Sequence, residues 1–408
     1  QFQGVKLAQE RVATGEGGVI WHTQGSGKSI LMVLLTKWLL EHDAEARVLV
    51  VTDRDELDKQ IGRVMRASGV VGEDATSPRI TSRLDFVQKL TSPSPRLLCA
   101  LIHKFSLDGS APPPNVQGRF HVLVDECHRT QSGDMNRQMK RWLPEAIFVG
   151  FTGTPLLSKD KQTTRELFGS NIHTYKFHEA VADEVVLDLK FEARDVPQRL
   201  DSPEKIDEWF ERRTQGLNNQ QRSELRRGWA TMERLMSSGE RKNRIIASIV
   251  HDFGVQPRLS NGRGTAILVA SSIYDACDYY KRFVDNTDFG RHCGIVTSFE
   301  PNHNAISTES SGSSERFKYD VYTQKVLAPG QSTEAYEELI KKAFVDEPAN
   351  MKLLIVVSKL LTGFDAPSCT YIYLDHALHD HNLFQAICRT NRLDGDDKTY
   401  GHIVDFKN

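Results

Sequence analysis

The sequence predicts an α/β protein with two lobes, each a parallel sheet flanked by helices, and a helical connector between them. Three observations support this fold class. Short β-rich runs alternate with helical stretches in two separate parts of the chain, polar residues directly follow several of these runs, and 408 residues exceed what one ordinary hydrophobic core organises. Open parallel sheets bind ligands beyond the carboxyl ends of their strands, so the polar residues there are the first functional candidates.

The first lobe is expected over residues 1–175. Five runs in this part have the apolar, β-rich composition of buried strands: Gly17–Thr23, Arg47–Asp53, Leu97–His103, His121–Asp125 and Ala146–Thr152. The stretches between them are helical in character. This alternation is typical of a parallel sheet with helices on its faces.

Residues 176–250 are expected to form a largely helical connector, because apolar residues between 201 and 244 recur at helical spacing within dense mixed charge. Such a charge run favours a solvated helical face over a nucleic-acid contact. The second lobe, over 251–408, is predicted from five further strand-like runs: Thr265–Ala270, Cys293–Thr297, Leu353–Val357, Thr370–Leu374 and His402–Phe406. Within this lobe, residues 300–315 lack apolar periodicity and are expected to form a mobile loop.

Composition excludes several classes of protein. No apolar run is long enough to cross a bilayer, no secretory segment opens the sequence, and the six cysteines lie far apart without a metal-type Cys-x-x-Cys pair. We therefore expect a cytoplasmic protein with no membrane partner. The net charge of −2 gives no overall basicity, so any nucleic-acid contact must come from local surfaces. Because the sequence opens at Gln1, we expect further sequence upstream.

A glycine-rich segment between the first expected strand and the next helix predicts nucleoside triphosphate binding. The segment His22–Ser29 contains Gln24, Gly25, Ser26, Gly27, Lys28 and Ser29 and precedes an apolar helical run. Glycines let backbone amides converge on phosphate oxygens, and the helix N-terminus favours anions. The Lys28 ammonium can reach the β/γ phosphates, and the Ser29 hydroxyl can bind Mg²⁺. His22 occupies the place of the usual first glycine, and a simple glycine-rich turn is the alternative.

Two adjacent acids follow another buried run. Asp125 and Glu126 come directly after Phe120–Val124, and His128 follows them. Asp125 would hold Mg²⁺ largely through water, since Mg²⁺ keeps much of its hydration. Glu126 would orient or deprotonate the attacking water, and His128 would link the nucleotide site to the other lobe. An exposed turn is the alternative, but the upstream phosphate loop favours the catalytic interpretation.

Hydroxyl groups follow the last strand of the first lobe. Thr152 and Thr154 flank a glycine after Ile147–Gly150, and Pro155 follows. These short side chains can hydrogen-bond to the acidic motif and report hydrolysis to neighbouring loops. A glycine-proline turn without function is the alternative.

Arginines in the second lobe are candidates for charge compensation. Gln385, Arg389 and Arg392 fall at i, i+4 and i+7, hence on one stripe of a predicted helix. Two guanidiniums so placed can contact one anion, and an arginine at the γ-phosphate stabilises transition-state charge. Solvated surface arginines are the alternative. The first lobe, however, offers no obvious electrophilic partner for a triphosphate.

Loops after other strands supply further candidates. Gly363 and Asp365, in Leu360–Pro367, can contact ribose or the lobe interface. Side chains suited to a nucleic-acid phosphate backbone occur at four positions: Thr52, Arg54, Lys104 and Thr362. Each loop alone would pass as a turn, but all follow the carboxyl ends of expected strands.

Taken in order along the chain, these motifs resemble those of superfamily 2 helicases and translocases. The similar segments are Gly25–Ser29, Val50–Leu57, Asp125–His128, Thr152–Pro155, Leu361–Pro367 and Gln385–Arg392. Trp21–Ser29, Thr52–Leu57 and Phe384–Arg392 look more closely like the motor (R) subunit of type I restriction enzymes. The resemblance implies two RecA-like lobes that close on ATP and move double-stranded DNA without fully separating its strands. It also implies a complex with modification and specificity subunits.

The resemblance also assigns roles residue by residue. Lys28 and Ser29 match the phosphate and Mg²⁺ ligands, and Asp125 and Glu126 the metal and catalytic acids. In the second lobe, Arg389 and Arg392 match arginine fingers, and Gly363 and Asp365 the nucleotide-coupling loop. Gln1 or Gln3 is a possible match to an adenine-contacting glutamine.

Two departures from the family pattern refine the expectation. Cys388 stands where many superfamily 2 members have glycine, which favours the restriction subgroup. No carboxylate-plus-Glu-x-Lys cluster of a nuclease occurs in the sequence, so endonuclease activity is expected only from a preceding domain. The open alternatives are a strand-separating DNA or RNA helicase and a nucleotide-gated DNA clamp.

Overall fold

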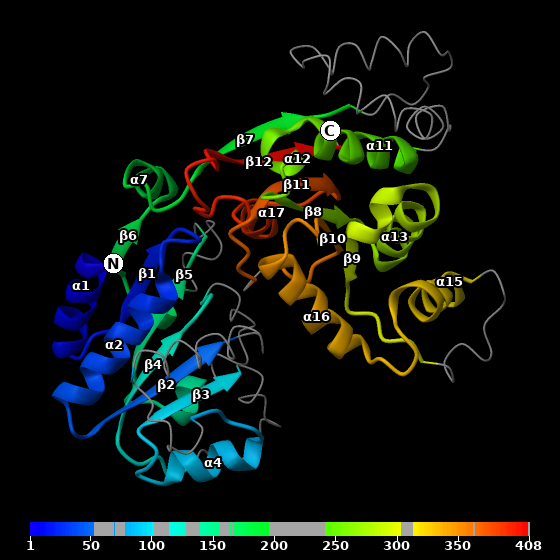
Figure 1. Ribbon diagram of the computed structural model, residues 1–408. Helices are drawn as coiled ribbons and strands as arrows, with labels where there is room; N and C mark the ends of the chain where they lie inside the picture. Colours follow the sequence, from blue (N-terminus) through cyan, green and yellow to red (C-terminus); the bar gives the residue numbers. More distant parts are fainter. Residues whose placement is uncertain are drawn as a thin grey trace. The chain divides into compact units, whose positions relative to one another are not determined.

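The computed structural model divides the chain into two units, Gln1–Val186 and Leu187–Asn408. It describes residues 1–52, 69, 78–101, 114–127, 139–154, 164, 166–195, 241–302, 313–361 and 364–406. Each unit contains a six-stranded sheet with helices packed on it (Figure 1), and every strand pair in both sheets is parallel. The predicted fold class, two parallel-sheet α/β units, is confirmed.

The sheet of the first unit has the order β3-β2-β4-β5-β1-β6. Its strands are β1 (Gly18–His22), β2 (Ala46–Thr52), β3 (Leu97–Leu101), β4 (Arg119–Val124), β5 (Ile147–Thr152) and β6 (Asn171–Tyr175). Its helices are α1 (Phe2–Ala13), α2 (Lys28–His42), α4 (Arg83–Thr91) and α7 (Phe177–Ala182). Each of the five strands predicted here overlaps a strand of the sheet, with β2 and β4 beginning one and two residues earlier than predicted, whereas β6 was not predicted.

Successive residues of the central strands point to opposite faces of this sheet, and both faces are covered. Ile20 and Val48 pack in one hydrophobic cluster with residues of α1 and α2. Their neighbours Val19 and Leu49 pack in a second cluster with residues of α4. A parallel sheet buried on both faces explains why these strands are near-continuous apolar runs in the sequence.

The sheet of the second unit has the order β7-β12-β11-β8-β10-β9. Its strands are β7 (Asp188–Ala193), β8 (Thr265–Ala270), β9 (Cys293–Val296), β10 (Leu353–Val356), β11 (Cys369–Asp375) and β12 (Tyr400–Asp405). The α-helices are α11 (Arg241–Val255), α12 (Pro257–Ser260), α13 (Ile273–Asn286), α15 (Ser314–Val321), α16 (Thr333–Asp346) and α17 (Asp380–Ile387). The described part of the unit also holds a 3-10 helix, η3 (Asp288–His292), and a π-helix, η4 (Tyr322–Val326). All five strands predicted in this part form.

The segment predicted as a helical connector, 176–250, holds α7, β7 and the first residues of α11. Its residues 196–240 lie outside the described residues. Strand β7 pairs along its length with β12 as an edge strand of the second sheet. Of the loop predicted over 300–315, residues 303–312 also lie outside the described residues.

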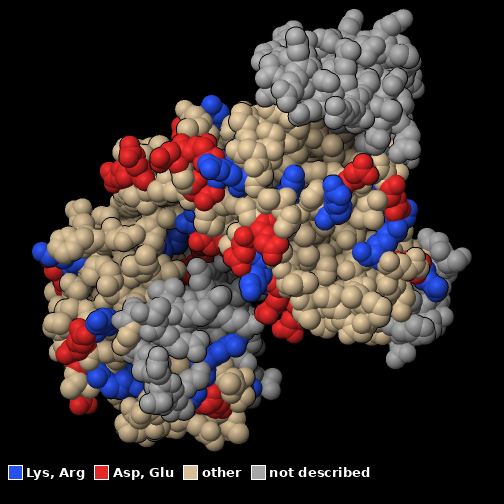
Figure 2. Space-filling model, in the orientation of Figure 1, with Lys and Arg blue, Asp and Glu red and all other residues tan. Residues whose placement is uncertain are grey.

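Charges of both signs are interspersed over the face in view in Figure 2 among the described residues. This agrees with the balance of 52 lysines and arginines against 54 acidic residues. Within the described ranges, no helix combines the length and the apolar character that a membrane span requires.

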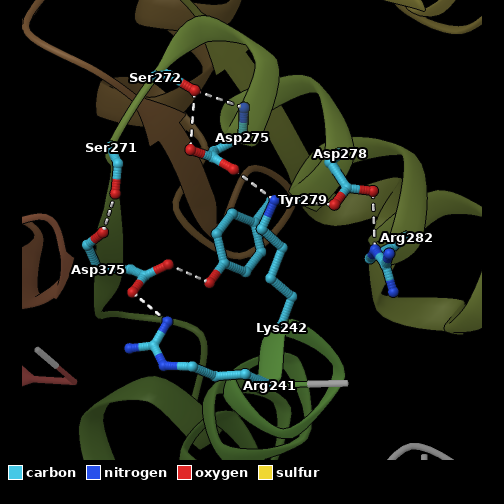
Figure 3. A network of polar contacts seen from close by, with 9 residues as sticks. All are labelled: Arg241, Lys242, Ser271, Ser272, Asp275, Asp278, Tyr279, Arg282 and Asp375. Carbon is cyan, nitrogen blue, oxygen red and sulfur yellow. Dashed lines mark hydrogen bonds and ion pairs between the residues drawn. The ribbon is translucent and has the colours of Figure 1, made fainter. Parts of the chain in front are cut away.

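A polar network fixes the start of α11 at the carboxyl edge of the second sheet (Figure 3). Arg241 pairs with Asp375, at the end of β11, at 2.5 Å, and the Tyr279 hydroxyl donates to the same carboxylate at 2.7 Å. Lys242 pairs with Asp275 and Asp278 of α13 at 2.6 and 2.9 Å. These contacts join α11 to α13 and β11 within one unit.

Candidate functional site

The carboxyl edge of the first sheet brings several sequence-predicted residues together. The loop after β1, the acids after β4 and the threonines around Gly153 after β5 all lie at this edge, because parallel strands end on the same side. Within the loop and the acid pair, the buried members are Thr23, Gln24, Ser26, Lys28, Asp125 and Glu126. The motifs that the sequence predicts to cooperate therefore meet in one place.

The loop after β1 owes its shape to its glycines. Gly25 and Gly27 have φ values of 91° and 88°, in the left-handed region that favours glycine. A β-carbon on Gly27 would lie 2.1 Å from Nε2 of Gln1, whose amide donates to the Ser26 carbonyl at 3.1 Å. The Ser26 hydroxyl donates to the Thr23 carbonyl at 2.6 Å. The loop thus closes on itself and leads directly into α2.

Lys28 is the first residue of α2, and its ammonium turns back into this loop. Its Nζ donates to the carbonyls of His22 at 3.3 Å and Thr23 at 3.5 Å, and the residue is buried. The buried Thr23 hydroxyl has no hydrogen-bond partner among the described residues. A cation, a free hydroxyl and a helix N-terminus around glycine-shaped backbone are the groups that bind phosphate oxygens.

The loop is joined to the acids by a direct hydrogen bond. Gln24 Nε2 donates to Glu126 Oε1 at 2.8 Å, and the Gly153 N–H donates to Glu126 Oε2 at 3.5 Å. Glu126 has a φ of 45°, which is uncommon for a residue with a side chain. The Asp125 N–H donates to the Val51 carbonyl at 2.9 Å, and Asp125 Oδ1 accepts from the Glu126 N–H at 2.9 Å. Backbone and side-chain contacts together fix both carboxylates.

Gly153 lies against the loop so closely that a side chain there would displace its neighbours. A β-carbon there would be 2.6 Å from Lys28 Nζ and 2.7 Å from Gln24 Nε2. On either side, the Thr152 hydroxyl donates to the Thr154 carbonyl at 3.2 Å and accepts from the Thr154 N–H at 3.3 Å. The turn after β5 therefore reaches the acids through the Gly153 amide.

A contact between two histidines, which the sequence did not predict, lies where β1 leads into the loop. His22 Nε2 and His173 Nδ1 are 2.7 Å apart, so one imidazole donates and the other accepts. Burial, followed by the charge of His173, lowers the pKa of His22 to about 3. A β-carbon on Gly4 of α1 would lie 3.1 Å from the His22 ring. His22, at the place of a usual glycine, thus connects the loop to α1 and β6.

Two residues could hold a divalent cation at this edge. They are Ser29, in the first turn of α2, and Asp125. Among the described residues, no three His, Cys, Asp or Glu side chains cluster as a site built wholly from protein ligands would require. One hydroxyl and one carboxylate suit Mg²⁺, which uses few protein ligands and keeps several waters.

In the second unit the predicted arginines contact the loop before β11. Arg389 is buried, and its Nη1 donates to the Phe364 carbonyl while its Nε donates to the Gln385 carbonyl at 3.2 Å. Arg392 Nε lies 3.2 Å from Asp365 Oδ1 in an ion pair. Arg389, Arg392, Gln385 and Asp365 therefore lie in one neighbourhood of this unit.

The expectation that these side chains share one helical stripe is wrong. Helix α17 ends at Ile387. The hydrogen bonds that follow span three residues instead of four: the Arg389 N–H donates to the Ala386 carbonyl, and the Thr390 N–H donates to the Ile387 carbonyl. Gln385 is helical, whereas both arginines follow the helix. The tight turn, and not helical periodicity, places the two guanidiniums.

Comparison with known proteins identifies the first part of the chain. Residues 1–223 match the family model described as SWI2/SNF2 ATPase. The chain belongs to the SWI2/SNF2 ATPase family. Residues 262–408 match a second model, described as type I restriction enzyme subunit R domain 3. The resemblance stated from the motifs is confirmed, and the chain is an ATPase that binds nucleotide.

Curated relatives of this ATPase carry names from restriction systems. A Methanocaldococcus jannaschii relative labelled MjaIXP is 30% identical over 423 residues, which cover 100% of this chain and 38% of the relative. The Staphylococcus aureus (strain COL) type I restriction enzyme SauCOLORF180P endonuclease subunit is 28% identical, over 98% of this chain and 43% of the relative. The chain thus spans about two fifths of the length of these relatives.

A solved structure shows the same fold. The ATP-dependent Type ISP restriction-modification enzyme LlaBIII, bound to DNA, matches the ATPase with a TM-score of 0.59 at 15% identity. The match covers 99% of this chain and 27% of the LlaBIII chain. At this identity the match supports the fold alone.

Of six other predicted site residues, one is buried and five lie outside the described residues. Thr52, at the end of β2, is buried. Arg54, Lys104, His128, Thr362 and Gly363 lie outside the described residues. Sequence reasoning missed His173 and gave Gln24 only a general place in the loop. The contact between Gln24 and Glu126 could not be predicted, because the two residues are 102 positions apart and no local pattern links them.

Proposed function

We propose that this ATPase is the motor of a type I restriction-modification complex and uses ATP hydrolysis to translocate double-stranded DNA. Two findings support this function. The family models of a SWI2/SNF2 ATPase and of R subunit domain 3 match successive parts of the chain, and the curated relatives are named as restriction enzyme subunits. The observation that carries the proposal is the Gln24–Glu126 hydrogen bond of 2.8 Å, which joins the phosphate loop to a carboxylate.

In the first unit we assign phosphate binding to the loop. The amides around Gly25 and Gly27 and the Lys28 ammonium bind the phosphate oxygens of ATP. Ser29 and Asp125 would hold Mg²⁺, which supplies positive charge to the phosphates when bound. The free Thr23 hydroxyl and the glycine-shaped backbone fit this assignment.

Glu126 orients and deprotonates the attacking water in this proposal. Its carboxylate is held by Gln24 and by the Gly153 amide, so it is fixed before the reaction begins. A carboxylate that is already in place need not reorient in the transition state, which avoids that free-energy cost. Thr152 and Thr154 report hydrolysis to neighbouring loops in this proposal, and His128 links the nucleotide site to the other lobe.

The second unit supplies the remaining positive charge. Arg389 and Arg392 neutralise charge that develops on the transferred phosphoryl group, and Gly363, Asp365 and Gln385 couple the nucleotide to this unit. For DNA, we propose contacts with the phosphate backbone at Arg54, Lys104 and Thr362; Thr52 is not among them, because its side chain is buried at the end of β2. Such contacts carry no base sequence. Modification and specificity subunits are the proposed protein partners.

ATP turnover and strand displacement together test this function. We expect hydrolysis to rise when duplex DNA is added to the full chain and to vanish in Glu126→Gln, which keeps the shape of the side chain but removes the base. We also expect displacement of a triplex-forming third strand without displacement of a duplex strand. Duplex unwinding would instead show a helicase, and turnover indifferent to DNA would show a nucleotide-gated clamp.

A further inference from the structure

Three cations converge on one short stretch of backbone in the second unit. The stretch is Phe364–Cys369, the segment that leads into β11. The Arg389 guanidinium donates to the Phe364 carbonyl, and Arg392 pairs with Asp365. The third cation is Lys398, whose Nζ donates to the Pro367 carbonyl at 2.6 Å and the Cys369 carbonyl at 2.8 Å. The segment is therefore held at both of its ends.

Lys398 is itself fixed by its surroundings. It is 3% exposed, and its N–H donates to the Gly395 carbonyl. Arg258 pairs with Asp394 and, at 2.6 Å, with Asp397, which anchors the loop that carries Lys398. Burial lowers the pKa of Lys398 to about 8, as expected for an ammonium whose partners are mostly neutral carbonyls.

The three contacts differ in strength. The side chains of Arg392 and Asp365 are 24% and 52% exposed, and such an ion pair contributes little. The Lys398 bonds are short, charge-assisted and shielded from water, which makes them stronger than neutral hydrogen bonds. Lys398 therefore holds this backbone more firmly than the Arg392–Asp365 pair does.

We propose that Lys398 is a positioning residue for ATP hydrolysis: it fixes the Phe364–Cys369 backbone on which Arg389 and Arg392 are held. This inference rests on the proposed function of the two arginines. Lys398 touches neither nucleotide nor water in this role. It acts through the backbone carbonyls at the end of the segment and so determines where the guanidiniums lie.

The test compares the full-length wild-type chain with Lys398→Met, which keeps the length of the side chain but removes its donors. Hydrogen exchange, followed by mass spectrometry, reports on peptides that contain Phe364–Cys369. We expect exchange there to become about tenfold faster or more, because the charge-assisted bonds are lost. We also expect kcat for ATP to fall about tenfold or more, while the dissociation constant of a fluorescent ATP analogue stays within about twofold.

Lys242→Met is the matched control. Lys242 also has two oxygen partners, Asp275 and Asp278, but it lies in the network at the start of α11 (Figure 3). This variant should leave exchange of Phe364–Cys369 unchanged. If Lys398→Met fails to fold, Lys398→Gln, which keeps an N–H₂ donor group but loses the charge, should show the same two changes to a smaller extent.

Two results would overturn the inference. One is a folded Lys398→Met protein with wild-type exchange in this segment. The other is faster exchange with an unchanged kcat, which would make Lys398 structural only. A wild-type chain that does not hydrolyse ATP would instead contradict the proposed function, and the exchange measurement would still report whether Lys398 holds the backbone.

Discussion

Gln24 and Glu126 are 102 residues apart in the chain and are joined by a buried hydrogen bond of 2.8 Å. The bond links the loop before α2 to the acid pair after β4. Glu126 adopts a φ of 45°, a conformation that costs about 1–2 kcal/mol for a residue with a β-carbon. Surrounding contacts must hold it there, and Gln24 is one of them. The phosphate loop therefore helps to hold the carboxylate in place.

We expect Gln24→Leu to lower kcat for ATP about tenfold with little change in KM. Leucine fills a similar volume but cannot donate, so the Glu126 carboxylate loses an orienting contact. Steady-state phosphate release measures both constants. Gln24→Glu places a second carboxylate beside the first and should reduce kcat further. An unchanged kcat in Gln24→Leu would show that the bond has no role in orientation.

Gly153→Ala should impair the site without unfolding the protein. The added methyl would lie 2.6 Å from Lys28 Nζ and 2.7 Å from Gln24 Nε2, so both side chains must move. Both atoms are the ends of flexible side chains, so we expect little loss in unfolding free energy and a larger relative loss of nucleotide affinity, because the Lys28 ammonium is displaced from the loop. Gly330→Ala is the control, since its β-carbon meets nothing within 4 Å although its φ is 78°. Equal nucleotide affinity in both variants would contradict the prediction.

Replacing either arginine should lower kcat to a similar extent, but the two substitutions should differ in their cost to the free energy of unfolding. We expect Arg389→Ala and Arg392→Ala each to lower kcat by about 10³-fold or more, as loss of transition-state charge compensation requires. Arg392→Ala should cost at most about 1 kcal/mol of stability, because its ion pair with Asp365 is partly exposed. Arg389→Ala leaves the Phe364 carbonyl without this donor and should cost about 1–3 kcal/mol. Urea unfolding and phosphate release distinguish the two effects.

The strands that could be predicted from sequence are those buried on both faces. All six residues of β8 are buried, and all seven of β2, and each strand holds an unbroken apolar stretch, Ala266–Ala270 in β8 and Val48–Val51 in β2. Strands β6 and β7 lie at the edges of their sheets, have one neighbour each and are largely half-buried or exposed. Their polar composition resembles that of a loop, so they carried no recognisable signal.

The candidate site was predictable where a local pattern imposes its own geometry. The glycines around Lys28 and the acids at Asp125 are such patterns, because each is read from residues close in sequence. Contacts such as Gln24–Glu126 and Lys398–Pro367 depend on where distant segments meet, which composition does not encode. The end of α17 at Ile387 was missed because no glycine or proline marks it.

The buried histidine His121 should make the first unit less stable as the pH falls below about 6.5. His121 is 3% exposed in β4, and burial lowers its pKa to about 4, with the charge of Asp43 opposing and that of Arg119 adding to the effect. Unfolding returns the imidazole to its ordinary pKa of about 6.5. Between these values the unfolded chain binds more protons than the folded one. The histidine therefore has no effect above pH about 6.5 and reduces stability as the pH falls toward 4.

Urea unfolding of wild type and His121→Leu at pH 7.5, 6.5, 5.5 and 5.0 measures this effect. Other groups titrate in both proteins, so the difference between the two isolates one imidazole. We expect the stability of the variant relative to wild type to improve by up to about 1.4 kcal/mol for each pH unit below about 6.5. His178→Leu is the control, because that side chain is exposed and unfolding changes its surroundings little. A constant difference across this range would show that His121 takes up a proton without unfolding.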